Sequence, residues 1–171
     1  MRKIIFLLSI TLHLSFAFAP GAKAQTSQNS HQHAPAVNTQ SILVGDSIQD
    51  NHAYLLWFNV VSYNDGTATS IATQDALINK IPLASKDKLL LLTALNEYRT
   101  KHDALVSSYN EQAKSSAPVA FASLLADLVA LVNQTRTTIN QGMTAAGVAA
   151  LHQHVLDEKS TMRVPASWSG Q

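Results

Sequence analysis

The chain has 171 residues, of which 46% are apolar and 13% are charged, and its 12 Lys and Arg residues nearly balance its 11 Asp and Glu residues. This length suits one domain, and the near-neutral charge argues against a general attraction to nucleic acid. Because the chain contains no cysteine, disulfide scaffolds, thiolate metal sites and cysteine nucleophiles are excluded.

The first 24 residues have the features of a secretory signal peptide. Two basic residues precede a mostly apolar run over 4–19, which is followed by Pro20 and by the small-x-small sequence Ala22-Lys23-Ala24. The run is shorter than the roughly 20 apolar residues that span a bilayer. We therefore expect cleavage after Ala24, an exported mature chain, and no membrane attachment after cleavage.

Four segments follow from this composition. Residues 1–24 are the signal peptide, and residues 25–41 are rich in Gln, Ser, Asn, His and Thr, which predicts a flexible polar leader. Residues 42–165 form a helical bundle domain, and residues 166–171 are a C-terminal tail. The nine basic residues of the mature chain form no dense cluster, so we expect no nucleic-acid partner.

The first predicted helix begins at Asp46 or Ser47, either of which could cap it, and ends near Tyr63. Its middle, 53–61, is apolar on nearly every side, so partners must enclose it or it belongs to an interface. A buried core is the first interpretation. The alternative is an interface for a protein partner or a second copy of the chain, formed by Tyr54, Trp57 and Phe58.

Helical spacing continues along the rest of the chain. It predicts a short helix over 70–81 and longer helices over 85–114, from 116 or 117 to 141, and over 144–162. In the helix predicted over 85–114, one apolar stripe contains Leu91, Leu95, Tyr98, His102, Leu105 and Tyr109. The predicted fold is all-α, an antiparallel bundle of about four long helices with a short connecting helix.

Three histidines are the candidate metal ligands. His52, His102 and His152 fall on or beside the apolar stripes of three different helices, so a bundle could bring them together on a transition metal. The chain has no Glu-x-x-His sequence of the kind that carboxylate-bridged metal bundles use. Structural histidines are therefore the first interpretation, and a metal site is the alternative.

No sequence motif indicates catalysis. The chain lacks a Gly-x-Ser-x-Gly elbow and a phosphate-binding glycine loop, and its one Ser-x-x-Lys match, at Ser85, is explained by a helix start. We expect no enzymatic activity, no catalytic residue and no cofactor.

Two resemblances add to this picture. The segments 53–61, 89–109 and 151–162 resemble those of small, exported, all-helical bacterial proteins with no assigned activity, which implies the periplasm or the extracellular space as location. The segment 92–96 is similar to the Leu-Thr-x-x-Gln motif of periplasmic stress chaperones, but Asn96 stands at the Gln position.

These observations together predict a function in binding. The expected protein is an exported, non-catalytic helical bundle that binds another protein, a hydrophobic small molecule or a copy of itself. The alternatives are a histidine-based metal-binding bundle and a holdase-like periplasmic chaperone.

Overall fold

The computed structural model describes residues 42–114 and 121–166, most of which are helical. Its helices pack against one another, which confirms the predicted all-α bundle. The predicted signal peptide (1–24), the leader (25–41) and residues 167–171 lie outside the described residues. The helices are α1 (Asp50–Val61), α2 (Ala68–Asn79), α3 (Ser85–Lys114), α4 (Phe121–Gly142) and α5 (Ala145–Lys159).

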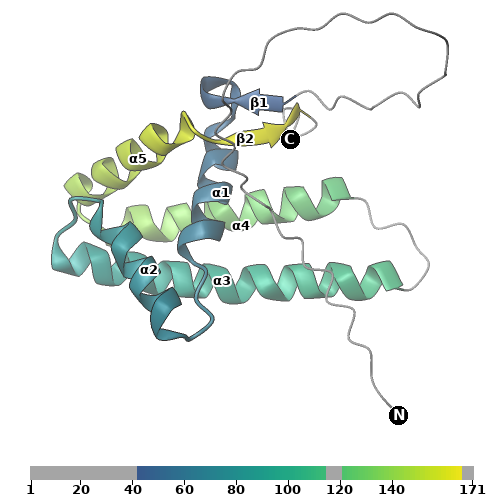
Figure 1. Ribbon diagram of the computed structural model, residues 1–171, viewed down its shortest axis with the longest axis horizontal. Coiled ribbons are helices and arrows are strands. Elements are labelled where there is room, and N and C mark those ends of the chain that lie inside the picture. Colours follow the sequence, from purple (N-terminus) through teal and green to yellow (C-terminus); the bar gives the residue numbers. More distant parts are fainter. Residues whose placement is uncertain (1–41, 115–120, 167–171) are drawn as a thin grey trace, which may run out of the picture. The chain divides into compact units, whose positions relative to one another are not determined.

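The two longest helices, α3 and α4, lie side by side and antiparallel, and α1 crosses this pair (Figure 1). α1 packs against each of the other four helices. This position explains why its sequence is apolar on nearly every side, because a helix with partners all around it has no solvent face to keep polar. α2 is the short connecting helix and joins α1 to α3.

The helical stripes predicted from the sequence are buried or half-buried in the structure. On α3, Leu91, Leu95 and Tyr98 are buried, whereas His102, Leu105 and Tyr109 are half-buried. On α4 the buried residues include Leu125, Val132, Thr135 and Ile139, and on α5 they include Leu151 and Val155. The spacing in the sequence therefore indicated the inward faces of the helices correctly.

Side-chain caps explain where two of the helices begin. The Thr67 hydroxyl accepts a hydrogen bond from the backbone of Ser70 at the start of α2, and the Thr144 hydroxyl accepts one from Gly147 at the start of α5. Each cap satisfies a backbone N–H that has no partner within the helix. The order and type of the helices thus agree with the sequence-based prediction, and the boundaries differ by a few residues.

The start of the first helix was predicted wrongly. α1 begins at Asp50, and the expected capping residues Asp46 and Ser47 belong to a short 3-10 helix, Gly45–Ser47. There the Ser47 hydroxyl donates to the backbone oxygen of Val44 and accepts from its N–H, so it caps this turn and not α1. Gly45 has φ +54, a conformation that favours glycine.

A two-stranded antiparallel sheet, which the sequence did not predict, joins the two ends of the helical domain. β1 (Ile42–Val44) pairs with β2 (Arg163–Pro165), with Leu43 opposite Val164. Val164 is almost fully buried, so the sheet has one inward-facing side chain that anchors it.

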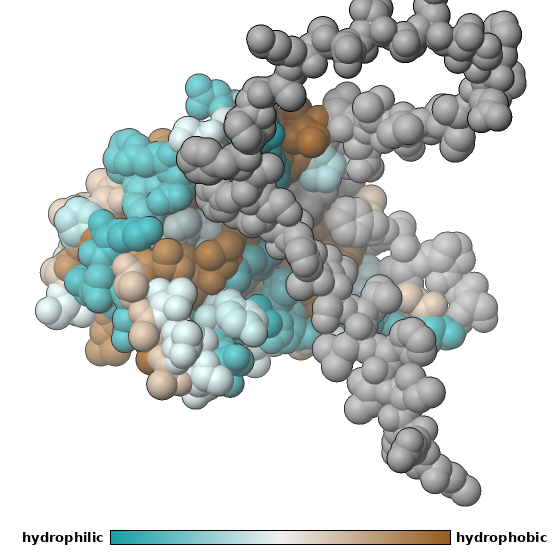
Figure 2. Space-filling view, in the orientation of Figure 1, coloured by the Kyte–Doolittle hydropathy of each residue, from teal (hydrophilic) through white to brown (hydrophobic). Residues whose placement is uncertain are grey.

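Polar and apolar side chains are mixed on the surface of the described residues, as the space-filling view shows (Figure 2). Several large apolar side chains are exposed, and they are distributed over β1, α1, α2 and α3. Within the described ranges, we find no helix that combines the length and the apolar character needed to cross a membrane.

Candidate functional site

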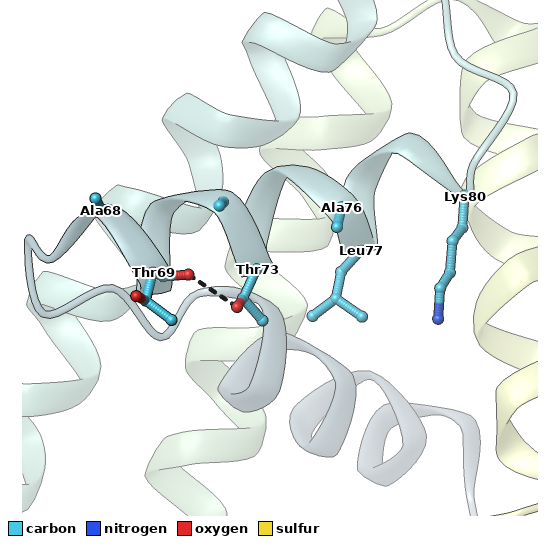
Figure 3. A pocket seen from close by; sticks show the side chains of 7 residues that line it. Ala68, Thr69, Thr73, Ala76, Leu77 and Lys80 are labelled. Atoms are coloured by element: carbon cyan, nitrogen blue, oxygen red, sulfur yellow. Dashed lines mark hydrogen bonds between the residues drawn. The ribbon is translucent and has the colours of Figure 1, made fainter.

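A shallow hollow runs along α2 (Figure 3). The residues that line it belong to α2, among them Ala68, Ala72, Ala76 and Leu77, or are its C-cap, Lys80. Small-molecule sites enclose most of their ligand with walls from several elements. A hollow with one helical wall lacks that enclosure, so it is not a candidate binding pocket in the described structure.

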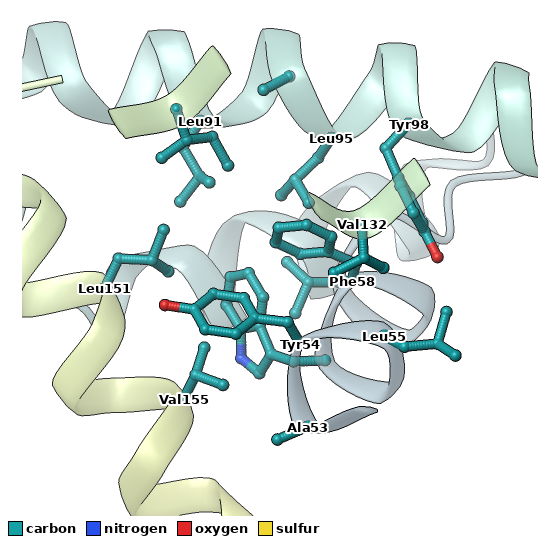
Figure 4. Close-up of a cluster of buried hydrophobic side chains, with 14 of the residues drawn as sticks. Ala53, Tyr54, Leu55, Phe58, Leu91, Leu95, Tyr98, Val132, Leu151 and Val155 are labelled. Atoms are coloured by element: carbon teal, nitrogen blue, oxygen red, sulfur yellow. The ribbon is translucent and has the colours of Figure 1, made fainter. Parts of the chain in front are cut away.

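The three aromatic residues considered for an interface lie in the core. Tyr54, Trp57 and Phe58 have exposed fractions of 4%, 5% and 0%. The Phe58 ring lies between those of Tyr54 and Tyr98, with centroid distances of 5.6 and 5.2 Å and edge-to-face geometry (Figure 4). These rings therefore fill the space between α1 and α3 and do not form an exposed surface on this chain.

A polar cluster surrounds the outer side of Tyr54, where α1, α4 and α5 meet. The guanidinium carbon of Arg136, on α4, lies 4.1 Å from the Tyr54 ring centroid, which is a cation–π contact. The Tyr54 hydroxyl is 3.2 Å from Nδ1 of His152, on α5, and the planes of these two rings are nearly parallel. We call Tyr54, Arg136 and His152 the junction cluster.

An ion pair lies beside the junction cluster. Lys159 Nζ, at the end of α5, donates to Asp50 Oδ1, in the first turn of α1, at 2.8 Å. The Lys159 side chain is 10% exposed and that of Asp50 is 48% exposed. The hydrogen bond from Lys159 lowers the pKa of Asp50, and the charges of His152 and Arg136 contribute in the same direction. Asp50 is therefore ionised at neutral pH, and Lys159 neutralises it.

Burial raises the pKa of Tyr54 above its ordinary value, and the charge of Arg136 opposes this rise. The phenol consequently stays protonated at physiological pH. A second histidine of α5 is close to the cluster, because the His154 ring meets the Trp57 ring edge-on at a centroid distance of 5.9 Å. The cluster thus combines one half-buried imidazole, a guanidinium and a neutral phenol, and a second half-buried imidazole lies beside it.

The structure does not bring the three candidate metal ligands together. His152 faces Tyr54, while His102 lies beside Tyr98 and its Nδ1 is 3.0 Å from Asp103. His52 is buried in the first turn of α1, and this burial lowers its pKa. Within residues 42–114 and 121–166, no group of three His, Asp or Glu side chains is arranged to hold a metal ion. His31 and His33 lie outside the described residues.

A buried carboxylate connects α3 to α5. Asp87 is 1% exposed, and it accepts hydrogen bonds from the Thr144 backbone at 3.0 Å and the Thr144 hydroxyl at 2.6 Å. The Thr144 side-chain bond is the largest cause of the lowered pKa of Asp87. Because these groups satisfy the start of α5 and fix the α4–α5 connection, we assign Asp87 a structural role.

The outer half of α3 forms a second candidate surface. Every buried residue of this 30-residue helix lies between Asp87 and Tyr98, and no side chain from 99 to 114 is fully buried. Figure 1 shows that the C-terminal end of α3 and the N-terminal end of α4 extend beyond α1. We call residues 99–114 of α3 and 121–130 of α4 the distal arm. Its half-buried apolar residues, which we call the strip, are Leu105, Val106, Tyr109, Leu124 and Leu128.

Hydrogen bonds and ion pairs on the distal arm are local. The Tyr109 hydroxyl donates to Asp127 Oδ2 at 2.6 Å, which links α3 to α4. Arg99 pairs with Asp103, and Lys114 pairs with Glu111, within α3. The charges of α3 on the arm are therefore paired with near neighbours, whereas Asp127 of α4 accepts from a neutral phenol.

No protein-family model, curated protein or solved structure matches this chain.

The sequence indicated two members of the junction cluster, although for other roles. It singled out Tyr54 as an aromatic of the first helix and His152 as a histidine near a stripe, but it gave no reason to select Arg136. The available signal was position, since Arg136 directly follows Thr135 of the buried stripe and so lies at its edge. Residues at the edges of apolar stripes on three helices cannot be assigned to one site from the sequence, because the packing of the helices decides which of them meet.

Proposed function

We propose that this protein is an exported, non-catalytic binding protein that captures a partner protein on the distal arm. Support for export comes from the basic start, the apolar run over 4–19 and the small-x-small sequence at Ala22-Lys23-Ala24. With such a signal, and with the resemblance to exported bacterial proteins, the place of action is the bacterial periplasm or the extracellular space.

One observation carries the binding role. The segment 99–114 has no fully buried side chain, although Leu105, Val106 and Tyr109 follow helical spacing on it. Two helices bury only part of each other's apolar faces, and a third element must cover the remainder. In the first half of α3 that element is α1. On the distal arm, Leu125 and Val129 of α4 are buried, but the apolar residues of α3 are left half-buried within the described structure.

The chemistry of the strip indicates the kind of partner. Its apolar residues lie on two neighbouring antiparallel helices, and such a pair suits the apolar face of an amphipathic helix. The flanking charges are paired within α3, so they add little long-range attraction of either sign. We therefore expect recognition through the shape and apolar character of the strip.

Site-specific photo-crosslinking in the native host tests the proposal. A photoreactive amino acid at Val106 should crosslink to one protein of a defined mass, and a second substitution, Leu105→Asp, should abolish that product. Leu89 supplies a matched control, because it is an exposed apolar residue of the same helix outside the arm, with 67% of its surface accessible. The same photoreactive group at Leu89 should give no such product.

Each other result contradicts the proposal in a specific way. A product with the mass of two copies of the chain would indicate self-association. Many products of different mass would favour a holdase-like chaperone. Equal crosslinking from Val106 and Leu89, or none from Val106, would show that the distal arm is not the binding surface.

A further inference from the structure

Two arginine–tyrosine pairs among the described residues are of the same type and differ in one respect. The guanidinium carbon of Arg99 lies 5.3 Å from the Tyr63 ring centroid, and that of Arg136 lies 4.1 Å from the Tyr54 ring centroid. Arg99 also has a carboxylate partner, since its Nε is 2.8 Å from Asp103. None of the ion pairs among the described residues includes Arg136.

Asp50, the carboxylate whose pKa the charge of Arg136 lowers, already forms an ion pair with Lys159. Asp50 accepts the hydrogen bond from Lys159, which is the main cause of its lowered pKa, while the influence of Arg136 on it is the smallest of those that act. Among the described ion pairs, Asp50 is thus taken by Lys159 and is not paired with Arg136. The Arg136 side chain is half-buried and so remains accessible to solvent.

Stacking on Tyr54 prepares Arg136 for a planar anion. An arginine on an aromatic face uses the face of its guanidinium. A hydrogen bond from Arg136 to Tyr54 lowers the phenol pKa, and the remaining N–H donors in the plane of the group stay available. The ring also restricts the side chain, so less conformational entropy is lost when an anion binds. A carboxylate matches this planar fork with two parallel hydrogen bonds.

His152 supplies a second donor next to Arg136. Burial keeps Tyr54 protonated, and its hydroxyl is within hydrogen-bond distance of His152 Nδ1. When the phenol donates to Nδ1, the neutral imidazole carries its proton on Nε2. That N–H adds a second hydrogen-bond donor for an anion held by Arg136.

We propose that Arg136, stacked on Tyr54 and assisted by His152, binds the carboxylate group of a ligand at the junction of α1, α4 and α5. The bound carboxylate takes the role toward Arg136 that Asp103 has toward Arg99. This site is separate from the distal arm, so a negative result for one proposal leaves the other unaffected.

Nuclear magnetic resonance titration of the purified exported protein tests the site. Sodium acetate replaces sodium chloride at constant ionic strength and pH 7, and the Arg136 Nε–H and His152 ring signals are followed. We expect saturable shifts at both residues. A second titration with an acetylated, amidated glutamate tripeptide distinguishes the sources, because tighter binding of acetate indicates a small organic acid and tighter binding of the tripeptide indicates a protein carboxylate.

Two matched variants complete the experiment. Arg136→Lys keeps the charge but loses the planar fork, and we expect about tenfold weaker acetate binding, since one charge-assisted hydrogen bond of the pair is lost. Arg99→Lys changes the arginine that already has a carboxylate, and it should leave acetate binding unchanged. The proposal is overturned by a wild-type protein without saturable shifts, which needs no variant to fold. Equal affinity in wild type and Arg136→Lys, or equal weakening by Arg99→Lys, also overturns it.

Discussion

The two halves of α3 differ in their residues and in their surroundings. From Ser85 to Tyr98, leucines at helical spacing are fully buried under α1, with Leu91 and Leu95 at 0% exposure. From Arg99 to Lys114 the same spacing continues through Leu105 and Tyr109, but every side chain there is half-buried or exposed. The first half contains five leucines and the second contains one, so burial here follows the local sequence as well as the third element that covers the helix.

This difference has consequences for stability and for function. Apolar burial stabilises the fold in proportion to the area removed from water, so the covered half of α3 contributes more to the free energy of unfolding than the second half does. The distal arm contributes less, and its strip keeps an apolar area that a partner can still bury. Mutations should therefore affect unfolding most strongly near α1 and binding most strongly on the arm.

The largest expected effect on stability is at Trp57, a buried residue of α1, the helix that covers the first half of α3. Trp57→Ala should lower the free energy of unfolding by about 3 to 5 kcal/mol, the range for truncating a large buried aromatic. Val60→Ala, at a position of the same helix that is 60% exposed, should stay within about 0.5 kcal/mol of the wild type. Urea denaturation measures both values. Similar small losses at the two positions would show that α1 is not the central helix.

A pair of leucines on α3 compares the two halves directly. Leu95→Ala should cost about 2 to 5 kcal/mol, because this side chain is fully buried. Leu105→Ala removes the same atoms from a half-buried position and should cost about 1 kcal/mol. Equal losses in urea denaturation would mean that the distal arm is covered as completely as the rest of the helix, and the comparison would fail.

The sequence predicted the helices and their inward faces because both depend on local spacing. Ser85 to Lys114 was predicted as one helix and is one helix in the structure. The sheet was not predicted, since its three-residue strands are too short for a periodic pattern and pair across 119 positions of sequence, from Val44 to Arg163. The junction cluster was missed for a related reason. Its residues come from three helices, and no motif joins them.

Two glycines at the covered end of the α3–α4 pair sharpen the comparison further. A Cβ on Gly147 would lie 2.4 Å from Asp87 Oδ2, and that carboxylate is held by two hydrogen bonds. Gly147→Ala should therefore destabilise by about 1 to 3 kcal/mol, as overpacking does, despite the better helix propensity of alanine.

Gly142 is the control for this substitution. A Cβ there would also lie 2.4 Å from its neighbour, but the neighbour is the end of the Leu90 side chain, which can rotate away. Gly142→Ala should remain within about 1 kcal/mol of the wild type. If Gly147→Ala proves as stable as Gly142→Ala in thermal unfolding, the Asp87 carboxylate is not fixed in the way that its hydrogen bonds indicate.

The smallest effect is a dependence on pH that belongs to the covered half. Burial lowers the pKa of His52 in the folded protein below the value of about 6.5 that it has in the unfolded chain. As pH falls below about 6.5, the unfolded chain therefore binds more protons than the folded protein, and stability decreases. Hydrogen bonds from Thr144 lower the pKa of Asp87, so a second loss should begin below about pH 4. Thermal unfolding midpoints between pH 8 and pH 3 measure both losses of stability.

Three variants assign these two losses to residues. His52→Gln should remove the loss that begins below about pH 6.5, the first phase, and Asp87→Asn the loss that begins below about pH 4, the second phase. His102→Gln, beyond the last buried residue of α3, should leave both in place. Loss of the first phase in His102→Gln, or its persistence in His52→Gln, would place the acid-sensitive group outside the region that α1 covers.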